Sequence, residues 1–69
     1  MTQQERILNY LITYGTITPK EAMEDLGIMR LGARIWDLKH AGHLIRAERE
    51  SSVNRWGDVT SYARYRLIR

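Results

Sequence analysis

The sequence predicts an α+β domain, mainly α, in which three helices are followed by a C-terminal β-hairpin. Two observations indicate this order. Apolar residues recur every three or four positions from residue 7 to residue 38, which is typical of amphipathic helices, and every second position after Gly42, which is typical of strands. The chain has 69 residues, 43% of them hydrophobic, so we expect residues 1–69 to form a single small domain.

The first helix is predicted to begin at the capping box Thr2-Gln-Gln-Glu5, whose two side chains can satisfy backbone N–H groups at the helix start. Its apolar face comprises Ile7, Leu8, Leu11 and Tyr14, and it is flanked by Tyr10 and Ile12. Gly15 is a suitable C-terminal cap. The pair Thr16-Ile17 is too short for an independent element, so we expect it to pair with the later hairpin.

A second helix is predicted to begin at another capping box, Thr18-Pro-Lys-Glu21, which has proline at the first helical position. We expect it to bury Ala22 and Leu26 and to end at Gly27.

A third helix is predicted over about residues 30–41, closed by Gly42. Its buried stripe comprises Leu31, Ile35 and Leu38. A turn of about three to four residues that contains Gly27 separates it from the second helix. Such a turn between a short helix and a longer one is typical of a helix-turn-helix, in which the two axes cross at a steep angle.

The hairpin is predicted from the change to a period of two residues after Gly42. Its inward-facing positions are expected to be Ile45, Ala47, Ala63, Tyr65 and Leu67. We expect residues 51–58 to form the connecting loop. On the outer face, Arg64 and Arg66 are expected to pair with Glu48 and Glu50 across the two strands.

The charge is distributed unevenly along the chain. The formal net charge is +3, with a pI near 9.7; residues 1–42 carry equal numbers of basic and acidic side chains, so the excess lies in residues 43–69. This balance is compatible with a polyanionic partner. No apolar run approaches the roughly 20 residues that span a bilayer, and residues 1–14 do not resemble a signal peptide, so we expect a cytoplasmic protein without a membrane partner.

We find no arrangement of residues that predicts catalysis. Ser51 and Ser52 have no plausible base, and Glu24 and Asp25 are adjacent carboxylates on a helix surface. The chain has no cysteine and two histidines, too few for a four-ligand zinc site. We therefore expect a protein that is not an enzyme and needs neither a cofactor nor a metal.

Several segments together resemble a known family. These are Gly15-Thr-Ile-Thr18, then Arg30-Leu-Gly-Ala-Arg-Ile-Trp-Asp-Leu38, then the closing Tyr62-Ala-Arg-Tyr-Arg-Leu67. They are similar to the small winged helix-turn-helix domains of phages and prophages, and the resemblance covers nearly the whole chain. It implies a double-stranded DNA-binding protein, either a transcriptional regulator or an accessory factor in recombination or replication. It also implies that the third helix enters the major groove and that the hairpin, the wing, contacts the backbone or the minor groove.

The residues themselves suggest which side chains would contact DNA. One set of candidates lies on the third helix or just before it, at positions that point away from the buried stripe or lie along its flank. A second set comprises polar and charged residues at the start of the second helix and in the hairpin. The candidate DNA-binding residues are Thr18, Lys20, Met29, Arg30, Ala33, Arg34, Asp37, Arg49, Asn54 and Arg55. Arg30 is the first choice for reading a base, because a guanidinium can donate two parallel hydrogen bonds to guanine.

Alternatives stay open at several of these positions. Thr18 is in any case a helix cap, and Arg34 could instead pair with Glu24, Asp25 or a helix terminus. Trp36 is more typical of a partly buried core edge than of a base contact. Trp56 is expected, by a small margin, to fold back on the sheet, rather than to lie along a sugar edge or meet a protein.

A second hypothesis is a protein-interaction module that docks on a host or phage protein, in which the charge is incidental and Trp36 and Trp56 are the anchors. If the DNA-binding protein instead forms a homodimer or needs a protein partner, Tyr10, Ile12 and Trp56 are the apolar candidates for that interface.

Overall fold

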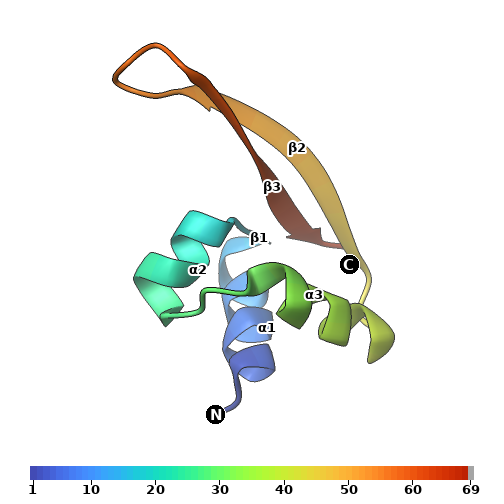
Figure 1. The fold of residues 1–69 in the computed structure, drawn as a ribbon. Helices are drawn as coiled ribbons and strands as arrows, with labels where there is room; N and C mark the ends of the chain where they lie inside the picture. The colour runs from blue at the N-terminus through green and yellow to red at the C-terminus, as the bar shows by residue number, and fades with distance from the viewer. Residues whose placement is uncertain (69) are drawn as a thin grey trace.

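A computed structural model describes residues 1–68 of the chain. Arg69, which contributes to the basic excess of the C-terminal third, lies outside the described residues. Over residues 1–68 the elements are α1 (Gln3–Tyr14), β1 (Thr16–Ile17), α2 (Pro19–Leu26), α3 (Leu31–His40), β2 (Ile45–Val53) and β3 (Val59–Leu67). The helices pack together at one end of the molecule, and the hairpin of β2 and β3 extends away from them (Figure 1). The predicted α+β class is therefore confirmed.

Both predicted capping boxes are present. The Thr2 hydroxyl accepts a hydrogen bond from the Glu5 N–H at the start of α1, and the Glu5 carboxylate accepts one from the Thr2 N–H. Thr18 and Glu21 repeat this exchange at the start of α2. Each pair satisfies N–H groups that a helix start would otherwise leave unbonded, so both helix starts are fixed locally.

Glycines end the helices, as predicted. Gly27, after α2, has a φ of +68°, a left-handed conformation that other residues adopt at a cost. Gly42 follows the end of α3, and the His43 N–H behind it returns to the Leu38 carbonyl at 3.1 Å. Four residues connect α2 to α3, and Ile28 among them is buried and anchors the turn in the core.

The sheet has the strand order β1-β3-β2 and is antiparallel throughout. Thr16 pairs with Arg66 and Ile17 with Tyr65, which confirms that this short segment joins the hairpin. The predicted loop over residues 51–58 is too long, because pairing continues to Val53 opposite Val59. Ser51 and Ser52 lie in β2; their small polar side chains obscure the alternation that would have revealed the strand.

The core lies where the three helices meet the base of the sheet. Its buried residues are Ile7, Leu11, Ile17, Ala22, Ile28, Leu31, Ile35, Leu38 and Ile45. Leu26 packs against the core without being fully buried. Two expected core positions are wrong. Tyr14, the last residue of α1, is 69% exposed with its ring against Tyr10. Ala47 is exposed on the edge strand β2, although its partner Tyr65 on the central strand packs against the core.

Candidate nucleic-acid interface

The turn before α3 presents two side chains to solvent. Met29 is 82% exposed, and Arg30, also exposed, is the N-cap residue of α3. The Arg30 carbonyl accepts the first helical hydrogen bond, from the Arg34 N–H at 3.3 Å, which fixes its backbone while its side chain stays outside the helix. The guanidinium has no hydrogen bond or ion pair within the described residues. Ala33, one turn further on, is half-buried.

Arg34 and Asp37 are held by other side chains, an outcome that was left open for Arg34 but not expected for Asp37. Arg34 Nε lies 3.1 Å from Asp37 Oδ2, close enough for an ion pair although the N–H is not aligned for a hydrogen bond. The Gln4 side chain of α1 donates to the same Asp37 oxygen at 3.1 Å. Arg34 does not pair with the expected Glu24 or Asp25, because Asp37 lies one turn away on its own helix. These contacts connect α3 to the start of α1.

Trp36 lies on the solvent side of α3. It is 59% exposed, so its expected place at a partly buried core edge is wrong. Its ring stacks on His40, one turn later, with centroids 3.6 Å apart, and His40 Nδ1 lies 2.9 Å from the Trp36 carbonyl oxygen. The two rings make a continuous aromatic surface on the face of α3 opposite its buried stripe.

No cluster of residues suited to a metal was found among residues 1–68.

The start of α2 offers one basic side chain. Thr18 is only 5% exposed, and both its hydroxyl and its backbone N–H are bonded to Glu21. The Glu21 carboxylate thus occupies the helix end at which a phosphate would bind. Lys20 remains exposed beside it, with no ion pair in the described part of the chain.

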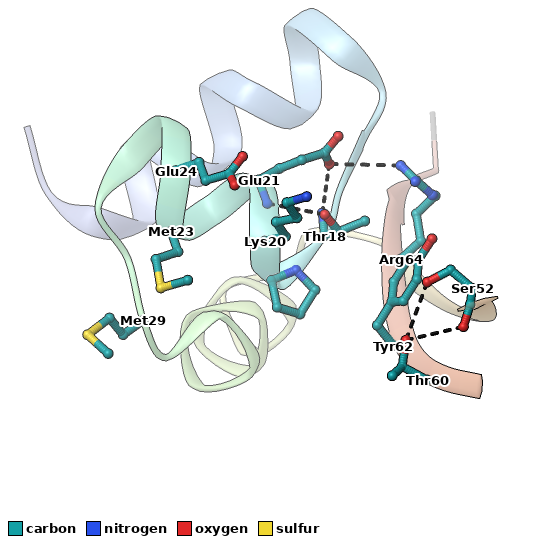
Figure 2. Close-up of a pocket in the computed structure, with 11 residues that line it drawn as sticks. Thr18, Lys20, Glu21, Met23, Glu24, Met29, Ser52, Thr60, Tyr62 and Arg64 are labelled. Carbon is teal, nitrogen blue, oxygen red and sulfur yellow. Dashed lines mark hydrogen bonds and ion pairs between the residues drawn. The ribbon is translucent and has the colours of Figure 1, made fainter. Parts of the chain in front are cut away.

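An open groove separates α2 from the hairpin (Figure 2). Its lining comprises Thr18, Pro19, Lys20, Glu21, Met23, Glu24 and Met29 on one side and Ser52, Thr60, Tyr62 and Arg64 on the other. Two basic side chains are balanced by two acidic ones, and the exposed Met23 and Met29 make one wall apolar. The groove is therefore electrically balanced, unlike a phosphate site.

The tip of the hairpin is organised by Asn54. Its side-chain oxygen accepts hydrogen bonds from the Trp56 and Asp58 N–H groups, at 3.0 and 2.9 Å. The five-residue loop from Asn54 to Asp58 is therefore a defined turn, and the Asn54 oxygen is occupied within it. Arg55 is exposed at the tip, and Arg49 is exposed further down β2.

Trp56 was expected, by a small margin, to fold back on the sheet, and this prediction is wrong. It is 76% exposed, and the Arg55 guanidinium carbon lies 5.3 Å from the centroid of its ring. The reason is geometric. The tip lies well beyond the helices, so the sheet there has no covered face that the ring could join (Figure 1).

The base of the hairpin carries the predicted cross-strand pairs. Arg64 Nε donates to Glu50 at 2.9 Å and Arg66 Nε donates to Glu48 at 2.8 Å. Arg64 also donates to the Thr16 hydroxyl at 3.0 Å. The hydrogen bond from Arg64 holds the pKa of Glu50 below its usual range. These two arginines are neutralised and contribute little free positive charge.

The model of the winged helix-turn-helix domain family matches residues 2–69. The chain belongs to this family. No curated protein and no solved structure gave a significant match. In this winged helix-turn-helix domain, α2, the turn and α3 form the helix-turn-helix and residues 45–67 form the wing; the family suggests DNA binding.

Tyr10 and Ile12, two of the candidate protein contacts, differ in their surroundings. Tyr10 packs against the core and donates a hydrogen bond to Asp25 at 2.8 Å, so it is not the exposed contact that was expected. That hydrogen bond, with burial, raises the pKa of Tyr10 to about 12. Ile12 is half exposed.

The remaining candidates lie on three parts of the winged domain: Lys20 at the start of α2, Met29 and Arg30 before α3, and Arg49 and Arg55 on the wing. The sequence did not predict the hydrogen bond from Gln4 to Asp37, which joins residues 33 positions apart. No local pattern marks such a contact.

Within residues 1–68, no helix is long and apolar enough to cross a bilayer.

Proposed function

We propose that this winged helix-turn-helix domain binds double-stranded DNA, with α3 in the major groove and the wing on the adjacent backbone. The observation that carries the proposal is the division of the basic side chains into two sets. Arg34, Arg64 and Arg66 are paired with carboxylates. Seven exposed lysines and arginines of the described chain have no ion pair: Arg6, Lys20, Arg30, Lys39, Arg46, Arg49 and Arg55. Of these, Lys20, Arg30, Arg49 and Arg55 lie at the start of α2, before α3 and on the wing, and they are the ones proposed to contact DNA.

The proposed roles follow from position. Arg30 precedes the first turn of α3 and reads a base edge, with Met29 and Ala33 beside it in apolar contact. Lys20, Arg49 and Arg55 contact phosphates. Thr18, Arg34, Asp37 and Asn54 act indirectly, since each already holds a neighbouring group in place.

The proposed biological role is that of a phage- or prophage-type regulator, or an accessory factor in recombination or replication, acting in the cytoplasm. A single module of this kind buries about 600–1,000 Å² of protein surface on DNA. Useful affinity would therefore require tandem sites, a second copy or a partner protein.

The test is a fluorescence-anisotropy titration with labelled random-sequence duplex at several salt concentrations. Each lost phosphate contact should reduce the slope of log K against log salt by about 0.9. We expect Arg55→Ala to reduce the slope and Arg30→Ala to weaken binding. Arg66→Ala, which removes an ion-paired arginine, is the matched control and should change little. Absence of salt-sensitive binding from folded protein contradicts the proposal.

A second candidate function is docking to a protein, and the groove beside α2 favours it. The exposed Met23 and Met29 offer adaptable apolar contacts, and Trp36 presents an aromatic surface nearby on α3. In this case Met23→Ala and Trp36→Ala would weaken partner binding, while affinity for DNA would be absent in all variants.

A further inference from the structure

The wing tip, residues 53–59, carries an apolar cluster that the winged-helix contacts described above do not use. Val53 and Val59 form the last pair of the hairpin, and both are largely exposed, as is Trp56 in the turn between them. The wing makes the molecule elongated, with extents of 39 × 22 × 20 Å. The cluster therefore sits at the end of a projecting two-stranded ribbon (Figure 1).

The turn fixes the backbone that carries the indole ring. The two hydrogen bonds to the Asn54 side chain fix the backbone at Trp56 and Asp58, and the Gly57 N–H returns to the Asn54 carbonyl at 3.0 Å. Arg55 lies over the Trp56 ring. A cation thus lies near one face of the indole, and most of the ring surface is open to a ligand.

The shape and chemistry of the tip indicate its occupant. A stable protein–protein interface covers about 800 Å² on each partner, and a narrow turn of a few residues does not offer such an area. A nucleobase requires only one flat apolar surface, and its phosphate requires a cation close by. Trp56 and Arg55 supply both within 5.3 Å of each other.

We propose that Trp56 stacks on a nucleobase of the bound DNA, so that the wing tip favours sites where a base is unstacked by a bulge, mismatch or flexible step. The inference rests on the proposed DNA binding and adds a specificity element to it. In a regular duplex both faces of each base are covered by neighbouring pairs, and uncovering a face costs a few kcal/mol per step. In a distorted site the base is already unstacked, so the protein should bind such a site more tightly than a regular duplex.

The test compares two duplexes of equal length, one fully matched and one with a single-nucleotide bulge. We expect the wild-type protein to prefer the bulged duplex by about tenfold, a size typical of stacking between one base and one aromatic side chain. Trp56→Ala should lose this preference and keep most of its affinity for the matched duplex. Trp56→Phe should retain part of the preference, and Trp36→Ala, the matched tryptophan control, should retain all of it.

Fluorescence supplies a second readout. Because the chain has two tryptophans, Trp36→Phe leaves Trp56 as the sole emitter, and its emission should be quenched on binding the bulged duplex. Equal preference in wild type and Trp56→Ala, or unchanged emission at saturation, overturns the stacking role and leaves DNA binding intact. Loss of binding to both duplexes at low salt overturns the DNA-binding proposal as well.

Discussion

Arg64 and Glu50 pair across the two strands of the hairpin, and Arg64 also contacts β1 and α2. The arginine Nε donates to the glutamate across the hairpin at 2.9 Å, and the same guanidinium donates to the Thr16 hydroxyl of β1 at 3.0 Å. Glu21 of α2 lies 3.8 Å from it. The Arg64 side chain therefore links β3 to β2, to β1 and to the start of α2.

The first prediction concerns pH. Since Arg64 lowers the pKa of Glu50 in the folded protein, the pair stabilises the fold above the usual glutamate pKa. The contribution is lost as pH falls through the lowered value. We expect urea unfolding to show a smaller loss of stability between neutral and acidic pH in Glu50→Gln than in wild type. Glu24→Gln, which alters an exposed carboxylate on α2, is the control and should behave like wild type.

The second prediction separates the two arginines of the helix-turn-helix. Arg34 is paired with Asp37 and Arg30 has no such partner, so Arg30→Ala should cost more affinity for DNA than Arg34→Ala. On a specific site, loss of a bidentate base contact costs about 1–3 kcal/mol. Anisotropy titrations of both variants measure the difference. An equal loss would show that the ion pair opens on binding.

The third prediction distinguishes capping from phosphate binding at α2. Thr18→Ala removes the hydroxyl bonded to the Glu21 N–H and should lower the free energy of unfolding by about 1 kcal/mol. Thr18→Ser should recover most of it. Lys20→Ala should leave stability unchanged and weaken DNA binding. The role assignment fails if Thr18→Ser binds DNA poorly while remaining as stable as wild type.

The fourth prediction concerns the turn of the helix-turn-helix. At Gly27 a Cβ would meet no atom within 4 Å, so only the left-handed backbone opposes a side chain there. Gly27→Ala should therefore destabilise the fold by about 1–2 kcal/mol. Gly27→Asn should cost less, because asparagine tolerates this conformation better. Thermal unfolding of both variants tests the order.

The fifth prediction concerns the packing that positions α3. Ile35 is almost fully buried, and Ile35→Val should cost about 0.5–1.5 kcal/mol in urea unfolding. Val53→Ala, a larger truncation at an exposed wing position, is the control and should be close to neutral. A comparable loss at Val53 would indicate that the wing tip is covered in solution.

Local chemistry explains which features could be predicted. The caps at Thr2 and Thr18 and the stripe of α3 depend on residues within one or two turns of each other, and all were predicted correctly. The pairing of Thr16-Ile17 with the hairpin was also expected, since a two-stranded sheet needs further support.

The features that could not be predicted depend on distant geometry. The exposure of Trp56 follows from how far the wing projects, which no residue near position 56 encodes. The Arg34–Asp37 pair was accessible in principle from its spacing, yet its orientation toward Gln4 depends on how α1 packs on α3. The DNA contacts themselves remain predictions.

The most direct test of the central claim is a map of backbone amide chemical shifts as duplex DNA is added to ¹⁵N-labelled protein. The account predicts that the largest changes fall together at Lys20, at residues 29–36 and at the wing tip, and that they diminish as salt is raised. Changes centred on Tyr10 and Ile12, or no changes at low salt, would contradict DNA binding through α3 and the wing.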